Sequence, residues 1–327
     1  MAIVAVFATH AFGIRFLWGG VDLFFVLSGF LITNVLLNSK TRPFGEYLGQ
    51  FYERRARRIL PAYCLLLVVM SFFYGVAWFR SWYFYLFLNN LLYVFHIYYP
   101  HALGVLWSLA VEEQFYLMWP FAVYFLVRRH LRAFCIALIV LAPVLRATVH
   151  FADGGDIYVL TPFRMDLLAA GGLLCLIWRE KPEWIKKAGP AIGCSFCFLG
   201  LLSLIALGHL GITSESNTRI SNVLVFEASL VMWLGFMVYA LSGWQIGWLK
   251  LAPLRYIGRI SYSMYLIHFG ILIGLRHIFH NPYKVAALAF ALSTAYAALS
   301  WILLERNLIK PTVQAPRFWA VRKTMPA

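Results

Sequence analysis

The stretch WSLAVEEQFYLMWP, residues 107–120, carries two adjacent acids, Glu112 and Glu113, within sequence that is apolar for many residues on each side. A carboxylate at membrane depth costs roughly 3 kcal/mol on insertion scales, so it normally has both a partner and a function. Neighbouring residues on a helix point about 100° apart, so we expect the two acids to serve different partners. Ser108, Glu112 and Tyr116 recur at i, i+4 spacing and predict a polar stripe facing the interior of a helix bundle. A purely structural ion pair is the alternative.

The composition is typical of a membrane protein. Of the 327 residues, 62% are hydrophobic and 13% are charged, and the mean hydropathy is +0.75. Soluble domains are about half apolar and about a quarter charged, so a soluble fold could not cover this much apolar surface. Because every backbone amide in a bilayer must be satisfied internally, the spans are predicted to be helices. The sequence therefore predicts an all-α, polytopic integral membrane bundle.

The net charge of +15 does not indicate a nucleic-acid-binding protein. The basic residues lie in short loops between apolar runs rather than on one soluble face, as the positive-inside rule describes. Anionic lipid headgroups and a phosphorylated cosubstrate are the expected partners instead.

Ten apolar runs are long enough to cross a membrane, and one further aromatic stretch, 81–99, is ambiguous. If 81–99 lies along the interface and the N-terminus is cytoplasmic, the most basic connections all fall on the cytoplasmic side. We therefore expect both termini in the cytoplasm, a single membrane domain at 1–310 and a cytoplasmic tail at 311–327. The ten runs are 2–18, 21–38, 60–80, 104–127, 133–151, 163–178, 189–209, 222–242, 257–278 and 284–305.

His10 lies within the first apolar run, where an ionisable side chain is unusual. Near neutral pH an imidazole can take a proton from a hydroxyl and later release it. Either Glu112 or Glu113 could then orient and stabilise the imidazolium, as the buried acid does in a catalytic triad. The alternative is a histidine that only packs against a neighbouring helix.

The longest connection, 39–59, is basic and is expected to form an amphipathic helix on the cytoplasmic surface. Guanidinium groups match phosphate geometry, so a cluster at a membrane mouth can hold a nucleotide pyrophosphate. An ordinary topology signal that binds anionic lipid explains the cluster equally well. The basic residues in question are Arg54, Arg55, Arg57 and Arg58.

Other polar residues are candidates for substrate contact or for helix packing. Asp22 is expected to cap the second helix, and Ala169–Gly172 to permit close helix contact. The histidines and the five cysteines show no spacing of metal ligands, so we expect no metal site and no disulfide framework. The candidate substrate-binding residues are Trp107, Ser108, Tyr116, Arg164, Asp166 and His268.

Five segments in this order resemble the membrane-bound acyltransferase 3 family, which acylates sugars and other hydroxyl compounds: GGVDLFFVLSGFLIT, FYERRARRILPAY, LWSLAVEEQFYLMWP, FRMDLLAAGG and ISYSMYLIH. The resemblance implies a ten-helix membrane protein that takes an acyl group, often acetyl, from cytoplasmic acyl-CoA. It also implies that His10 is catalytic and that the arginine run handles acyl-CoA. Glu112 and Glu113 match the acidic motif of the family.

The family pattern places a basic residue eleven positions before the histidine, which here would fall before Met1. Eleven helical residues rise about 16 Å, so that side chain would lie near the cytoplasmic entrance. We therefore expect that a few upstream residues have been lost.

The leading hypothesis is an O-acyltransferase of a bacterial inner membrane, with acetyl-CoA as donor and a saccharide or glycoside as acceptor. Direct attack and a covalent acyl relay are both open, and a separate protein could complete the transfer. A glycolipid transporter or flippase also needs polar residues at membrane depth, and a truncated, inactive family member is the third possibility.

Overall fold

A computed structural model describes residues 1–14, 17–75, 81–97, 99–149 and 156–309. All regular structure in these ranges is helical, which confirms the predicted all-α class. The predicted tail, 311–327, lies outside the described residues. The α-helices are α1 (Ala2–Phe12), α2 (Gly20–Ser39), α3 (Phe44–Tyr74), α4 (Trp82–Tyr85), α5 (Trp107–Phe125), α6 (Arg128–Thr148), α7 (Asp156–Val159), α8 (Met165–Glu180), α9 (Pro182–His209), α10 (Arg219–Ser242), α11 (Ala252–Ile278), α12 (Pro282–Ser300) and α13 (Arg306–Leu308).

Short 3₁₀ helices and one π-helical turn connect these elements. They are η3 (Asn89–Leu92), η4 (His101–Leu106), η5 (Thr161–Phe163), η6 (Ile246–Lys250) and a π-helical turn, η7 (Trp301–Glu305).

Each of the ten predicted apolar runs overlaps one of the longer helices. Among the described residues, seven helices are long and apolar enough to cross a membrane: α2, α3, α6, α9, α10, α11 and α12 with its continuation to Leu308. The other three predicted spans correspond to α1, α5 and α8, so the count of ten and the cytoplasmic termini remain predictions. The described part of 81–99 contains only α4 and η3, in agreement with the prediction that it does not cross.

The basic segment and the span that follows it form one helix. α3 has 31 residues and continues through Pro61. At 1.5 Å per residue it is about 46 Å long, which exceeds the hydrocarbon thickness of about 30 Å. The helix predicted within 39–59 therefore begins at Phe44 and is continuous with the span, so the arginines lie on an extension of the span.

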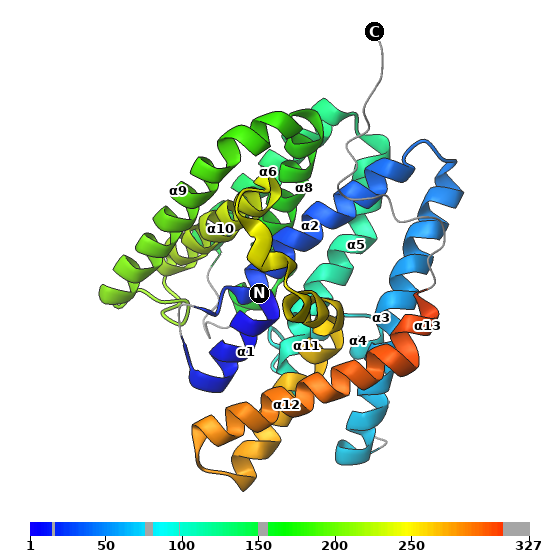
Figure 1. Ribbon diagram of the computed structural model, residues 1–327, viewed down its shortest axis with the longest axis vertical. Coiled ribbons are helices and arrows are strands. Elements are labelled where there is room, and N and C mark those ends of the chain that lie inside the picture. Colours follow the sequence, from blue (N-terminus) through cyan, green and yellow to red (C-terminus); the bar gives the residue numbers. More distant parts are fainter. Residues whose placement is uncertain (15–16, 76–80, 98, 150–155, 310–327) are drawn as a thin grey trace.

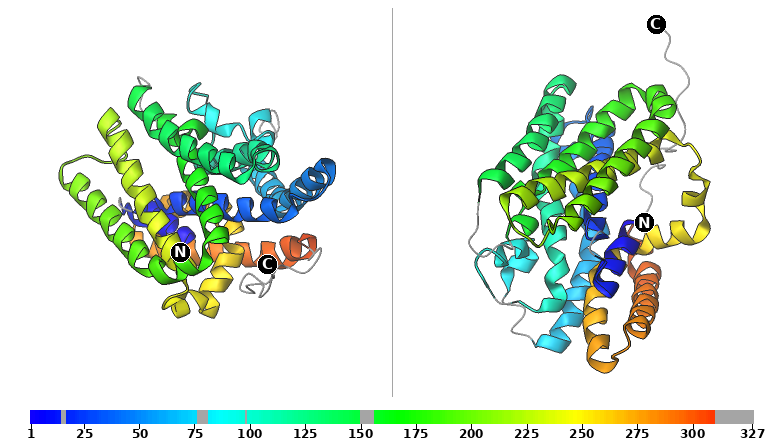
Figure 2. Two further views of the ribbon diagram at one scale, coloured as in Figure 1. Left: turned by 90° about the horizontal axis from the view of Figure 1, so that it is seen from above. Right: turned by 90° about the vertical axis from the view of Figure 1, so that its left-hand side faces the viewer.

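α2 crosses the middle of the bundle (Figures 1 and 2). Helices α6, α8, α9 and α10 lie on one side of it, and α3, α11 and α12 lie on the other. The short α1 contacts α2, α11 and α12. α2 thus separates two groups of helices and is placed to contribute to any cavity between them.

Glycines set the contact between α2 and α8. A Cβ at Gly29 of α2 would collide with the backbone of Leu168, and one at Gly171 of α8 would collide with the backbone of Val26. Without side chains at these positions the two backbones touch, as small residues permit in membrane bundles. The prediction of close helix contact at Ala169–Gly172 is confirmed.

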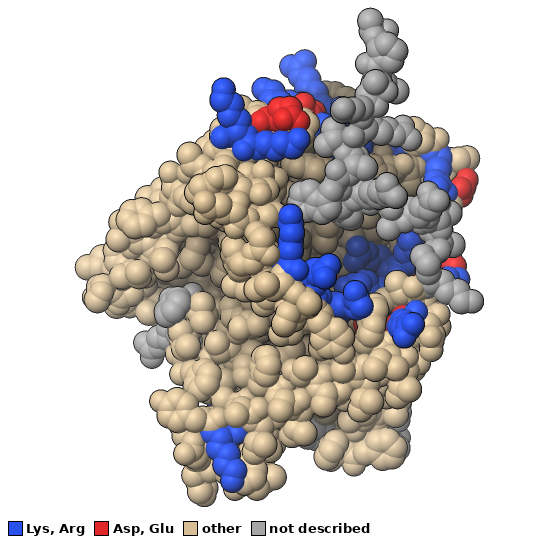
Figure 3. Space-filling view, viewed as in Figure 1, with Lys and Arg blue, Asp and Glu red and all other residues tan. Residues whose placement is uncertain are grey.

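Lys and Arg side chains gather at the upper end of the molecule and around a hollow near the middle of the face shown in Figure 3. One further basic group lies at the lower end, and most of the remaining surface in this view is uncharged. The large uncharged part of this face is expected of a membrane protein.

Candidate active site

Two cavities in the bundle share part of their walls. The first, which we call the histidine cavity, has a volume of about 780 Å³ and is lined by His10, Thr9, Trp18, Tyr93, His101, Trp107 and Tyr158, among others. The second, which we call the arginine cavity, has a volume of about 490 Å³ and lies between α2, α3, α5 and α11. Val21 and Tyr265 line both cavities, so the cavities adjoin at these two side chains, which we call the partition.

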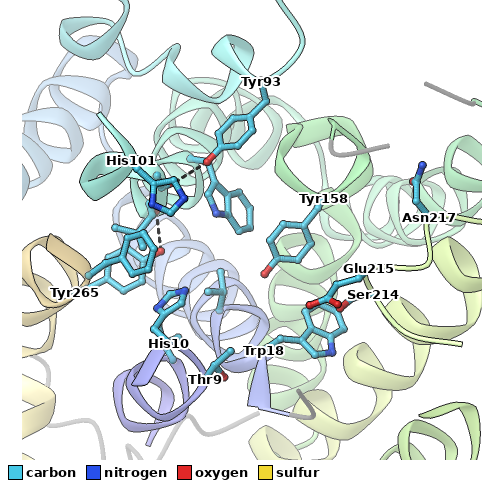
Figure 4. A pocket seen from close by; sticks show the side chains of 16 residues that line it. Thr9, His10, Trp18, Tyr93, His101, Tyr158, Ser214, Glu215, Asn217 and Tyr265 are labelled. Atoms are coloured by element: carbon cyan, nitrogen blue, oxygen red, sulfur yellow. Dashed lines mark hydrogen bonds between the residues drawn. The ribbon is translucent and has the colours of Figure 1, made fainter. Parts of the chain in front are cut away.

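His10 lies in the last turn of α1, and the end of that helix is fixed by two contacts. Gly13 adopts a left-handed conformation with φ 66°, and its N–H donates to the carbonyl of Thr9. The Arg276 guanidinium of α11 donates to the His10 carbonyl at 2.6 Å. Its positive charge at this position also interacts favourably with the negative end of the helix dipole. His10 is therefore held at the cavity wall, and Figure 4 shows its ring among the lining side chains.

A chain of hydrogen bonds connects His10 to the backbone of α11. The Nδ1 atom of His10 lies 2.9 Å from Nε2 of His268, and Nδ1 of His268 lies 2.7 Å from the Tyr265 carbonyl oxygen. The carbonyl oxygen can only accept, so Nδ1 of His268 must donate to it. His268 in its neutral form then accepts at Nε2 from the Nδ1–H of His10.

This arrangement determines which nitrogen of His10 carries the lone pair. Since Nδ1 donates to His268, Nε2 of a neutral His10 is the acceptor atom. The expectation that Glu112 or Glu113 orients the imidazole is wrong, because His268 occupies that position. The predicted substrate contact of His268 also requires correction, since its ring is fully buried behind His10 and does not line the histidine cavity.

The polar stripe predicted on α5 is confirmed. Ser108, Glu112 and Tyr116 all line the arginine cavity. Tyr116 is hydrogen-bonded to Ser28 of α2, and Ser108 shares a 2.6 Å hydrogen bond with the hydroxyl of Tyr265. Trp107, one residue earlier, lines the histidine cavity, so the start of α5 contributes to both cavities.

The two acids serve different environments, as predicted. Glu112 faces the arginine cavity, whereas Glu113 does not line it and has a buried Oε1 with no hydrogen-bond partner among the described residues. Neither acid lines the histidine cavity. We therefore separate their proposed roles from that of His10.

The four arginines do not act as one group. Arg55 and Arg58 line the arginine cavity, and the Arg55 guanidinium lies 4.8 Å from the centre of the Tyr116 ring. Arg57 instead pairs at 2.5 Å with Glu53 on the exposed face of α3. Arg54 is exposed and lines neither cavity.

Arg164 and Asp166 lie outside both cavities, in a buried ion network. Arg164 pairs with Asp22, and both side chains have no exposed surface. Asp22 also accepts from Ser229 at 2.6 Å, which shows that its predicted role as a helix cap is wrong. Asp166 pairs at 2.7 Å with Arg146, so we assign this network to holding α2, α6, α8 and α10 together rather than to substrate contact.

We expect Arg164→Met to destabilise the fold, because it leaves Asp22 buried without its guanidinium partner. Breaking one side of a buried pair costs about 3–5 kcal/mol, which corresponds to a fall of about 10 °C in the thermal midpoint of the protein in detergent. Arg132→Met removes an exposed partner of Glu180 and should change the midpoint little. Equal midpoints for the two variants would contradict the structural role of the network.

No sequence pattern indicated several of the residues that line the histidine cavity. Tyr93 donates to the Gly104 carbonyl at 3.1 Å and, with His101, comes from the connection before α5. Burial raises the pKa of Tyr93, which keeps its hydroxyl a neutral donor. Tyr265, by contrast, was within reach of sequence analysis, because it lies three residues before His268 in the quoted segment ISYSMYLIH.

Comparison with known proteins identifies the family of this chain. A family model described as an acyltransferase domain matches residues 1–305. The chain belongs to this acyltransferase family. The chain is 28% identical to O-acetyltransferase OatA of Staphylococcus aureus (strain MRSA252), over 93% of the chain and 55% of the relative. It is 31% identical to peptidoglycan O-acetyltransferase OatA of Listeria monocytogenes, over 83% of the chain and 48% of the relative.

The chain thus spans about half the length of these curated relatives. No solved structure matches it. Its apolar helices and bacterial relatives identify an integral membrane protein of a bacterial cell membrane. Across the described ranges, no three His, Cys, Asp or Glu side chains are grouped to hold a metal ion.

Proposed function

We propose that this protein is a membrane O-acetyltransferase that moves an acetyl group from acetyl-CoA to a hydroxyl of a saccharide. One observation carries the proposal: a basic cavity and a histidine cavity adjoin at Val21 and Tyr265, which line both. The names of the relatives, which include a peptidoglycan O-acetyltransferase, support a saccharide acceptor.

The arginine cavity is suited to the donor. Arg55 and Arg58 lie on its wall and can bind coenzyme A phosphates through charge-assisted hydrogen bonds. Leu27, Leu31 and Ile59 give the same cavity an apolar surface for the uncharged arm that carries the thioester. Glu112 lies on this wall as well, where its carboxylate can hold the Arg55 guanidinium in position.

The histidine cavity is suited to the acceptor. Nε2 of His10 takes the proton of the acceptor hydroxyl as its oxygen forms the new ester bond with the acetyl carbon. The carbon–sulfur bond of the donor breaks, and the coenzyme A thiolate leaves and is protonated. His268 accepts from the Nδ1–H of His10 throughout and keeps the ring oriented. Direct transfer and an acyl relay through the partition use the same base.

Replacing either arginine of the arginine cavity should weaken donor binding. We expect Arg55→Gln and Arg58→Gln each to raise KM for acetyl-CoA about tenfold, since each removes charged hydrogen bonds to phosphate. Arg57→Gln is the matched control, because Arg57 lies in the same run but pairs with Glu53 outside the cavity. If Arg57→Gln raised KM as much as the other two, the run would act as a diffuse charge rather than a site.

The proposed activity is tested by incubating purified protein in nanodiscs with radiolabelled acetyl-CoA and a soluble disaccharide of N-acetylglucosamine. We expect label in the saccharide as an alkali-labile ester, dependent on the protein. Label that stays in acetyl-CoA would contradict the proposal and indicate an inactive family member. Movement of a glycolipid between leaflets without acetylation would indicate a transporter. Label on an added protein rather than on the saccharide would indicate a separate acceptor-transfer partner.

A further inference from the structure

The connection between α9 and α10, residues 210–218, forms the wall of the histidine cavity opposite the candidate base. It contributes Ser214, Glu215 and Asn217 to the lining. Figure 4 shows these side chains across the cavity from His10 and Tyr265, with Trp18 beside Ser214 and Glu215 and Tyr158 between the two sides. A molecule that places a hydroxyl at His10 and extends beyond it would therefore meet this connection.

Hydrogen bonds within the connection give it a defined conformation. The Thr213 N–H donates to the Ser216 hydroxyl at 2.9 Å, and that hydroxyl donates to the Gly211 carbonyl at 3.1 Å. The Asn217 side-chain oxygen accepts from Asn222 of α10 at 3.1 Å. Thr218 and Ser221 then cap α10 reciprocally. Groups held in this way lose little conformational entropy on binding a ligand.

The lining combines aromatic rings with polar groups. The ring centres of Trp107 and Tyr158 are 4.6 Å apart, and those of Trp18 and Tyr158 are 5.7 Å apart. Sugar rings present apolar C–H faces, which pack on aromatic rings, and hydroxyls around the edge, which need polar partners. A volume of about 780 Å³ exceeds what one sugar ring requires, so the cavity has room for a second.

We propose that the 210–218 connection selects the acceptor by binding the sugar ring that is not acetylated. The Glu215 carboxylate accepts hydrogen bonds from hydroxyls of that ring, and the Asn217 side chain contacts its edge. Trp18 and Tyr158 support the ring faces between the connection and His10. This inference rests on the proposed function, and it adds residues that no catalytic motif of the sequence contains.

The test measures steady-state kinetics with acetyl-CoA and the N-acetylglucosamine disaccharide. Glu215→Gln removes the charge at almost constant size, and Asn217→Ala removes the amide. We expect each to raise KM for the disaccharide about tenfold, with KM for acetyl-CoA unchanged, since the connection lies away from the arginine cavity. Glu183→Gln is the matched control, because Glu183 lies near the other end of α9, exposed and paired with Lys186.

Two results would overturn the inference, and they differ from a failure of the proposed function. Unchanged KM for the disaccharide in both variants, with normal transfer by the wild type, would show that the connection does not select the acceptor. Equal affinity of the wild-type and Glu215→Gln proteins for the disaccharide in a direct binding titration would show the same without turnover. Absence of acetyl transfer by the wild-type protein would instead reject the proposed function itself.

Discussion

Substitution of His10 by alanine is expected to reduce kcat for acetyl transfer by about 10²–10⁴-fold. The variant removes Nε2, the atom that the hydrogen bond to His268 leaves as the proton acceptor in the histidine cavity. KM for acetyl-CoA should change little, because the donor is assigned to the arginine cavity. Initial rates of acetylation of the disaccharide by purified protein provide the measurement.

The control for this substitution is His277→Ala. His277 is exposed near the end of α11 and lines neither cavity, so its removal should leave the rate within about twofold. A His10→Ala protein that kept the wild-type rate and melted at the wild-type temperature would exclude His10 as the base.

Substitution of His268 by alanine should lower kcat about 100-fold while leaving KM for both substrates nearly unchanged. His268 is fully buried and does not reach the cavity, so it acts only through His10. Without it the Nδ1–H of His10 loses its acceptor, and the ring is free to adopt the other tautomer or orientation.

Partial rescue distinguishes this positioning role from a packing role. His268→Gln supplies an amide oxygen that can accept from His10, whereas His268→Leu fills similar space without an acceptor. We expect kcat to fall in the order wild type, Gln, Leu, at similar thermal midpoints. Equal rates for the Gln and Leu variants would mean that His268 contributes only volume.

The helices were predictable because they follow from local sequence. Apolar runs of spanning length identified the position of each long helix, and i, i+4 spacing alone identified the stripe of Ser108, Glu112 and Tyr116. The close approach of α2 and α8 was readable from the glycines near Gly171, since small residues permit such contacts wherever they occur in a bilayer.

Partners across helices could not be predicted, because they depend on how each helix is rotated and how far it extends. The sequence offered Glu112 or Glu113 as the partner of His10, whereas α11 supplies His268. No sequence pattern distinguished Arg55 from Arg57, although Arg55 faces the arginine cavity and Arg57 pairs with Glu53. The lining from 210–218 depends on the path of a connection and left no periodic pattern in the sequence.

In the proposed function, the donor and the acceptor bind in separate cavities on the two sides of a single partition. Sealed proteoliposomes test it most directly, with radiolabelled acetyl-CoA confined to one compartment and the disaccharide to the other. We expect acetylated disaccharide in the acceptor compartment, and we expect this product to be lost in His10→Ala vesicles of equal protein content. Product formed only when both substrates share one compartment would contradict it.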